Sequence, residues 1–326
     1  VWCQWFAHYK MRSVSKNSIA GSEPVSSGAD STRSILYALT ANAAIAVAKG
    51  VAAIVTHSSA MLAEAIHSLA DTVNQLLLLL GMKRARQPPS PDYPLGYGKE
   101  IYFWSFIVAL LLFSVGGMFS IYEGWHKLHA PKPLESPWIA IAVLVFSVIA
   151  EGLSLLGCLK EINKVRYGRT LWHWFRETRH SELLVVFGEE IAALLGLTFA
   201  LVALSATMIT GNPVYDALGS MAIGVLLIAI AVLVGREVKA LLVGQGVEPL
   251  VKDAMVNFLQ QQSTVSTVFN IVTLQMGSDV MVAVKAKMVP VSSDRALIDE
   301  INPVESAFRF EFPQVMWLFF EPDVED

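Results

Sequence analysis

The stretch EAIHSLAD, residues 64–71, lies inside a long apolar run of the chain. Its His67 and Asp71 are four residues apart, so they share one face of a helix. Ionisable side chains inside a membrane are costly, and they usually serve ions, protons or substrates. Imidazole and carboxylate are also natural ligands of divalent transition metals. The stretch therefore indicates a membrane protein that handles such metals.

The composition agrees with a membrane protein. Of the 326 residues, 54% are hydrophobic and 16% are charged, whereas a soluble domain has about 25% charged residues. The formal net charge of −4 gives no argument for nucleic-acid binding. The two cysteines, Cys3 and Cys158, are too few for a disulfide framework or a zinc site built from thiolates.

Six apolar stretches each have about the 20 residues that a helix needs to cross a bilayer. They predict an all-α transmembrane bundle of six helices within residues 34–240. A flexible tail, residues 1–33, is expected before it, because residues 12–32 are rich in Ser, Gly and Asn. The six predicted segments are 34–53, 59–82, 101–122, 138–159, 182–208 and 214–234.

The distribution of Lys and Arg orients the bundle. These residues cluster in three connections, 83–99, 160–180 and 236–239, while the opposite loops contain only Lys127 and Lys132. Because cytoplasmic loops carry an excess of positive residues, the three clusters should share one side. Both termini are therefore expected to be cytoplasmic, in a bacterial inner membrane or an organelle membrane.

The remainder, residues 241–326, is more polar and has its own pattern. It predicts a small α+β domain, with the order αββαβ and a ferredoxin-like fold, on the cytoplasmic side. Pro303 should kink or end the second helix, and the many aromatic residues near the C-terminus suggest a dimerisation surface. The predicted elements are 249–262, 265–274, 279–289, 293–307 and 315–320.

Several polar residues accompany His67 and Asp71 in the predicted membrane helices. Four residues of the second segment form one polar stripe, which serves either chemistry or polar contacts between helices: Glu64, His67, Asp71 and Asn74. On the fifth segment, Glu189 and Glu190 lie about 100° apart around the helix, so they cannot point the same way.

The first and fourth segments add further candidates. Asn42 and Lys49 are seven residues apart and share a helix face. Lys49 either neutralises a carboxylate of the bundle or extends to the membrane interface. Glu151 on the fourth segment has no local partner in sequence, so a pairing with Lys49 across the bundle is one interpretation.

These residues resemble the cation diffusion facilitator family, the ZnT-type divalent metal transporters. The similarity extends from about residue 34 to the C-terminus, and it depends on Asn42, Lys49 and the stretches 63–71, 93–99 and 212–216. It implies a homodimer in which each protomer holds a metal between the second and fifth segments. It also implies six spans followed by a cytoplasmic αββαβ domain.

The resemblance assigns ligands residue by residue. His67 and Asp71 match the ligand pair of the second segment, and Glu190 takes the place of the usual aspartate on the fifth. Val186 stands where the family commonly has a histidine. The acidic pair resembles a divergent, mitochondrial-type branch, in which Glu189, Asn42, Glu182 or water completes the site.

The expected function is export of a divalent metal from the cytosol or matrix, coupled to inward proton movement by alternating access. Zinc suits a mixed site of nitrogen and oxygen ligands best, while manganese, iron and cobalt remain alternatives. The transporter would need a lipid bilayer and no cofactor. Two rivals are an intramembrane metalloenzyme, which lacks a His-Glu-x-x-His motif here, and a metal-sensing membrane scaffold.

Overall fold

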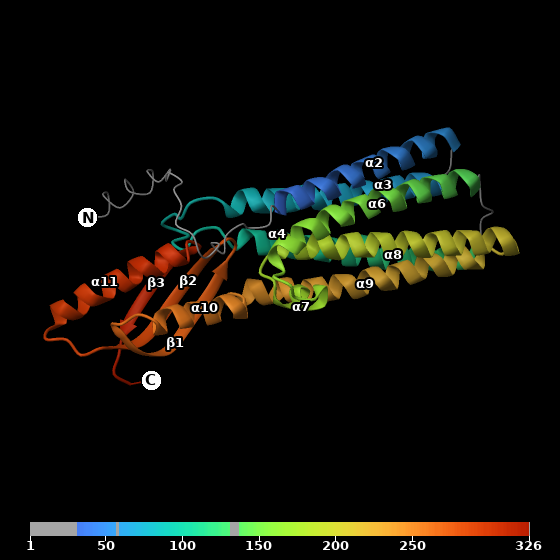
Figure 1. Ribbon diagram of the computed structural model, residues 1–326. Coiled ribbons are helices and arrows are strands. Elements are labelled where there is room, and N and C mark those ends of the chain that lie inside the picture. Colours follow the sequence, from blue (N-terminus) through green and yellow to red (C-terminus); the bar gives the residue numbers. More distant parts are fainter. Residues whose placement is uncertain (1–30, 57–58, 131–136, 326) are drawn as a thin grey trace.

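The computed structural model describes residues 31–56, 59–130 and 137–325 (Figure 1). The side chains of residues 59–64, 66 and 67 lie outside the described part, among them those of Glu64 and His67. The predicted tail 1–33 also lies outside it, except that its last three residues already belong to a helix. A bundle of long helices extends from a small α+β domain at one end (Figure 1).

The bundle is built from long helices joined by short turns. Its elements are α2 (Ser31–Thr56), α3 (Ser59–Ala85), α4 (Glu100–Leu111), η1 (Leu112–Met118), α5 (Phe119–His129), α6 (Pro137–Val165), α7 (Leu171–Glu177), α8 (Ser181–Thr210) and α9 (Val214–Val243). The short helix α7, capped by the side chain of Thr170, was not predicted.

Five stretches of the described residues are long and apolar enough to cross a membrane: Ser31–Ala52, Glu100–His129, Trp138–Val165, Ser181–Thr210 and Val214–Val243. They coincide with five of the six predicted segments. The second predicted segment is α3, a helix of 27 residues that carries the polar stripe and is the least apolar of the long helices. The sixth span therefore stays a prediction.

The third predicted segment is one continuous helix that consists of α4, η1 and α5. Its middle part, η1, is a π-helix. The N–H of Phe119 donates to the carbonyl of Ser114, five residues earlier. This helix packs very closely against α9. A Cβ atom added to Gly224 of α9 would lie only 2.7 Å from the carbonyl oxygen of Gly117 in η1. Glycine is needed where two backbones approach this closely.

The remaining helices pack in a continuous series. α2 contacts α3 and α6, α6 contacts α8, and α8 contacts α9. A buried apolar cluster joins them, and it includes Trp174 of α7, which is fully buried. The polar stripe of α3 and the acidic pair of α8 therefore belong to one packed bundle.

The C-terminal domain has the predicted order αββαβ. It consists of α10 (Pro249–Gln260), β1 (Val265–Met276), β2 (Asp279–Met288), α11 (Asp294–Glu311) and β3 (Val315–Pro322). β1 and β2 pair antiparallel and β2 and β3 pair parallel. α11 continues through Pro303 to Glu311, so the prediction of an end near residue 307 was wrong.

The domain has a core on one face of its sheet. Alternate residues of β2 are buried, from Val280 to Met288, as expected for a strand with one covered face. Met255 of α10 and Phe308 of α11 belong to the same cluster, so both helices cover that face. A full ferredoxin-like fold stays a prediction.

Two close contacts join the domain to the bundle. The turn of the β1–β2 hairpin lies against Gly98, where an added Cβ atom would clash with the carbonyl oxygen of Met276. The N–H of Gly277 donates to the hydroxyl of Tyr102 on α4 at 2.9 Å. Nearby, Arg169 binds Glu177 at 3.2 Å and Glu248 at 2.7 Å. The domain is thus held against the helix ends that lead into the bundle.

Candidate functional site

The polar stripe of α3 is the first component of the candidate site. α3 is helical throughout the predicted stripe, so residues four apart lie on one face. Asp71 is half-buried and Asn74 is buried. The backbone of His67 is part of this helix, and its position four residues before Asp71 places it on the same face. Its side chain lies outside the described part.

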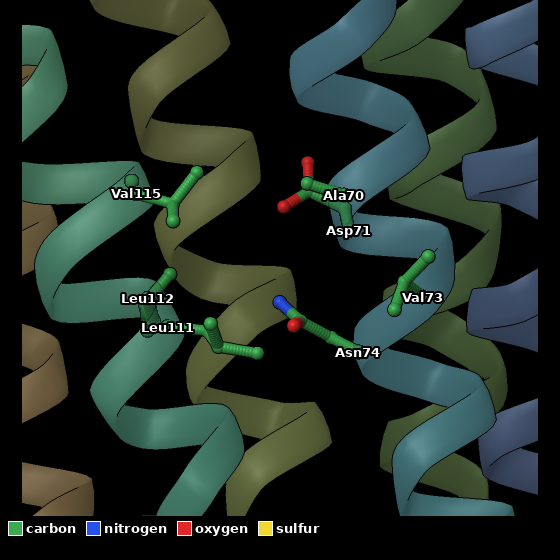
Figure 2. Close-up of a pocket in the computed structure, with 8 residues that line it drawn as sticks. Ala70, Asp71, Val73, Asn74, Leu111, Leu112 and Val115 are labelled. Atoms are coloured by element: carbon green, nitrogen blue, oxygen red, sulfur yellow. The ribbon is translucent and has the colours of Figure 1, made fainter.

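Asp71 lies at a cavity between α3 and η1. The cavity has a volume of about 210 Å³, and the carboxylate of Asp71 points into it (Figure 2). The side chain of Asn74 lines the same space, and Val115 faces it from η1 (Figure 2). The remaining lining residues are Ala70, Val73, Leu111, Leu112 and Gly116.

Glu189 of α8 is held by two amide side chains of α3. Asn74 Nδ2 donates to Glu189 Oε1 at 3.1 Å, and Gln75 Nε2 donates to Glu189 Oε2 at 2.6 Å. Glu189 also interacts electrostatically with Asp71. Because both oxygens accept from fixed amide donors, the carboxylate is oriented toward the stripe. The two carboxylates of α3 and α8 therefore belong to one polar site.

Glu190 has different neighbours. It is buried, and Ser154 of α6 donates to its Oε1 atom at 2.6 Å. Glu151, one turn before Ser154 on α6, interacts electrostatically with Glu190, Asp71 and Lys49. The predicted pairing of Glu151 with Lys49 stays a prediction. The adjacent glutamates point to different helices, as their angular separation predicted.

Asn42 and Glu182 are the other two candidate ligands. Asn42 is buried on α2, which packs mainly against α3 and α6. Glu182 lies at the start of α8, where Ser31 Oγ donates to it at 2.7 Å and His180 Nδ1 lies 3.5 Å away. It is seven residues before Glu189, about 10 Å along the helix axis. The structure does not bring Glu182 to Asp71.

The described side chains contain no group of three or more His, Cys, Asp or Glu residues that can hold a metal ion. His67 is not among those side chains. Asp71 and Glu189 are the described side chains of the candidate metal site. Their carboxylate oxygens are hard donors that suit a divalent cation. The assignment of His67, Asp71, Glu189, Glu190 and Asn42 as ligands stays a prediction.

Sequence reasoning missed the amide and hydroxyl groups that position the acids. Gln75 is 1% exposed, and it directly follows the last residue of the predicted stripe. A polar residue adjacent to a stripe is a usable signal, because it lies at the stripe's edge and faces a neighbouring helix. Ser154 is three residues after Glu151, and this spacing on one helix face is the corresponding signal on α6.

Comparison with known proteins adds an independent observation. Residues 35–243 match the family described as Cation efflux transmembrane domain. The chain is 34% identical over 246 residues to the mouse protein named "Proton-coupled zinc antiporter SLC30A9, mitochondrial", covering 74% of this chain and 43% of that protein. It is 31% identical over 215 residues to Metal tolerance protein C4 of Arabidopsis thaliana, covering 65% of this chain and 47% of that protein.

A shorter similarity connects the chain to yeast. Mitochondrial metal transporter 1 of Saccharomyces cerevisiae is 42% identical over 89 residues, which is 27% of this chain and 17% of that protein. The chain spans less than half the length of each of these curated relatives.

Proposed function

Because the chain belongs to the cation efflux family, we propose that it exports a divalent transition metal, zinc first, in exchange for protons. It is a multi-pass integral membrane protein. Family membership places it among metal transporters and not among enzymes. The proposal concerns which metal moves, what drives the movement, and which residues hold the ion.

The observation that supports the metal site most is the contact of Glu189 on α8 with Asn74 and Gln75 of α3, the helix that carries Asp71. Both carboxylates lie in one polar site, and Glu189 is oriented by Asn74 and Gln75. We place His67 beside them, because it precedes Asp71 by one helical turn on the same face. One imidazole and two carboxylates leave a fourth position for water or for Asn42.

Glu190 is assigned a different role from the one that the resemblance gave it. Its side chain is engaged with Ser154 and Glu151 on the α6 side, while Glu189 occupies the α3 side. In the proposal Glu189 is the metal ligand on α8. Glu190 is not a ligand, and its contacts with α6 help to fix the position of α8. This assignment changes one residue of the predicted ligand set and keeps the pairing of the same two helices.

Zinc and proton exchange are proposed on two grounds. The names of the relatives include a proton-coupled zinc antiporter and a mitochondrial metal transporter, and mixed nitrogen and oxygen ligands suit zinc. Metal binding requires a neutral imidazole and ionised carboxylates, so each binding event releases protons. Protons that arrive from the far side then displace the metal.

The proposal includes α3 as a sixth span. With six spans, the basic connections 83–99 and 160–180 lie on the same side as the C-terminal domain, in agreement with the positive-inside rule. The membrane is that of an organelle, and mitochondria are the first choice, because several relatives carry that location in their names. The C-terminal domain then lies in the compartment from which metal is exported.

Purified protein in proteoliposomes tests the transport. Zinc added outside should enter faster when the lumen is acidic, and Asp71→Ala should abolish this uptake. Asp92→Ala is the matched control, because Asp92 is exposed in the loop after α3. Uptake that is indifferent to both the pH gradient and Asp71→Ala would contradict the mechanism. Zinc binding without any flux would favour a metal-sensing scaffold.

A further inference from the structure

The connection between α6 and α8 lies where the chain leaves the membrane and enters it again. The apolar stretch of α6 ends at Val165 and that of α8 begins at Ser181, and α7 lies between them beside the bundle (Figure 1). The ring of Trp174 on α7 meets that of Phe187 on α8 edge to face, with the centroids 5.9 Å apart. Phe187 follows Ser181 by six residues, which is about 9 Å along the helix axis. This contact fixes α7 at the level of the lipid headgroups.

One face of α6 carries an exposed apolar stripe that ends in a cation. Ile149, Leu153 and Leu156 are 58%, 66% and 64% exposed, and their spacings of four and three residues place them on one helix face. In a bilayer such a stripe faces the acyl chains. Lys160 continues the stripe and is exposed. A lysine at this position extends its ammonium group into the headgroup layer.

The connection also exposes aromatic rings beside cations. Tyr167 is 57% exposed and Trp172 is 60% exposed, and these two residue types are enriched at membrane–water interfaces. Arg176 is exposed one helical turn after Trp172, and Arg166 directly precedes Tyr167 and is half-buried. Apolar rings and positive charges together suit the boundary between acyl chains and headgroups.

The cations of this connection differ in their partners. Arg169 and Arg179 bind acceptors within the protein. Three others form no ion pair with any residue in the described part of the chain: Lys160, Arg166 and Arg176. Three such charges at the membrane surface attract negative groups in the headgroup layer.

We propose that this connection is a docking surface for anionic phospholipids. The surface consists of Lys160, Arg166, Tyr167, Trp172 and Arg176. Its three cations bind the negative headgroup, and its two rings lie against the start of the acyl chains. A free phosphate ion would satisfy the cations alone, whereas a lipid also covers the rings. The inference goes beyond transport, because it depends neither on the metal nor on what drives its movement.

Fluorescence quenching in nanodiscs tests the surface in the full chain. A fluorophore is attached at Asn163→Cys, which is exposed one turn after Lys160 on the same face. The background is Cys3→Ser, which keeps the buried Cys158. The quencher is a nitroxide on the acyl chain of phosphatidylglycerol or, for comparison, of phosphatidylcholine, at the same mole fraction in discs of phosphatidylcholine.

Phosphatidylglycerol should be enriched beside the fluorophore at least about tenfold over phosphatidylcholine, because each Lys or Arg at a headgroup contributes roughly a fivefold factor. The triple variant Lys160→Gln, Arg166→Gln and Arg176→Gln should lower the enrichment to less than about twofold. A matched control should leave it unchanged, because it removes three exposed cations of the C-terminal domain: Lys252→Gln, Lys287→Gln and Arg309→Gln.

Equal quenching by the two lipids would overturn the docking surface. Equal losses in the two triple variants would also overturn it, since they would show attraction by net charge alone. Inorganic phosphate at constant ionic strength should not lower the quenching, and displacement by phosphate would indicate a small-anion site instead. Should the triple variant fail to fold, Arg176→Gln alone should lower the enrichment about fivefold, and an unchanged value would reject the surface.

Discussion

Glu189 and Glu190 are neighbours in sequence with separate partners in the bundle. Glu189 accepts from Asn74 and Gln75 of α3, and Glu190 accepts from Ser154 of α6. Their divergence follows from helix geometry and was predictable. Which glutamate faces α3 was not, because packing sets the rotation of α8 about its axis. Gly188 takes part in that packing: a Cβ atom there would lie 2.6 Å from Val234.

Paired substitutions distinguish the two glutamates. Glu189→Gln should weaken zinc binding at least about tenfold, because it removes a charged ligand. Glu190→Gln should leave the affinity within a factor of about three, which corresponds to less than 1 kcal/mol. Calorimetric titration of detergent-solubilised protein measures both. The assignment of the ligand to Glu189 is wrong if the larger loss occurs in Glu190→Gln.

At the scale of elements, most helices and strands were predictable from composition and periodicity. The order αββαβ was correct because alternation in strands such as β2 and the apolar faces of α10 and α11 are local signals. The π-helix η1 was not predictable, because the close approach of Gly117 to α9 is a contact between distant segments. α11 continues through Pro303, where its packing against the sheet and α10 outweighs a local helix breaker.

Arg169 joins three elements near the C-terminal domain. Its guanidinium is buried, and it binds Glu177 of α7, Glu248 before α10, and the carbonyl of Val165 at the end of α6. Arg169→Ala leaves Glu248 without this partner, so the free energy of unfolding should fall by about 3 kcal/mol. Thermal or denaturant unfolding in detergent measures the change.

Arg176→Ala is the matched control for this prediction. Arg176 lies on α7 and is exposed, so its removal should change the free energy of unfolding by no more than about 0.5 kcal/mol. Equal effects of the two substitutions would show that the buried ion pairs at Arg169 do not hold the domain against the bundle.

At the scale of the whole molecule, the homodimer that the sequence resemblance implies would need a contact surface, and the C-terminal domain is its expected place. Phe308 and Phe312 are buried in its core, whereas Phe310 is 89% and Phe319 is 55% exposed. Exposed aromatic residues are typical of protein interfaces. The number of aromatic residues near the C-terminus already predicted that the core of this domain could not hold all of them. The structure shows which are buried and which are exposed.

Phe319→Asp tests this surface, and we expect it to convert the dimer to a monomer, because a carboxylate would be buried in an apolar contact. Light scattering in detergent measures the mass. The control is Val243→Asp, which is exposed at the end of α9, before α10, the first helix of the folded domain. A Phe319→Asp protein that stays fully dimeric would indicate that the membrane helices alone hold the two protomers together.

The central claim is that one cation is held between α3 and α8 by His67, Asp71 and Glu189. Zinc X-ray absorption of the full chain addresses it directly. We predict one zinc ion per chain with about four nitrogen and oxygen ligands at roughly 2.0–2.2 Å, one of them an imidazole, and loss of this zinc in Asp71→Ala. Sulfur ligation, or an unchanged spectrum in Asp71→Ala, would contradict the claim.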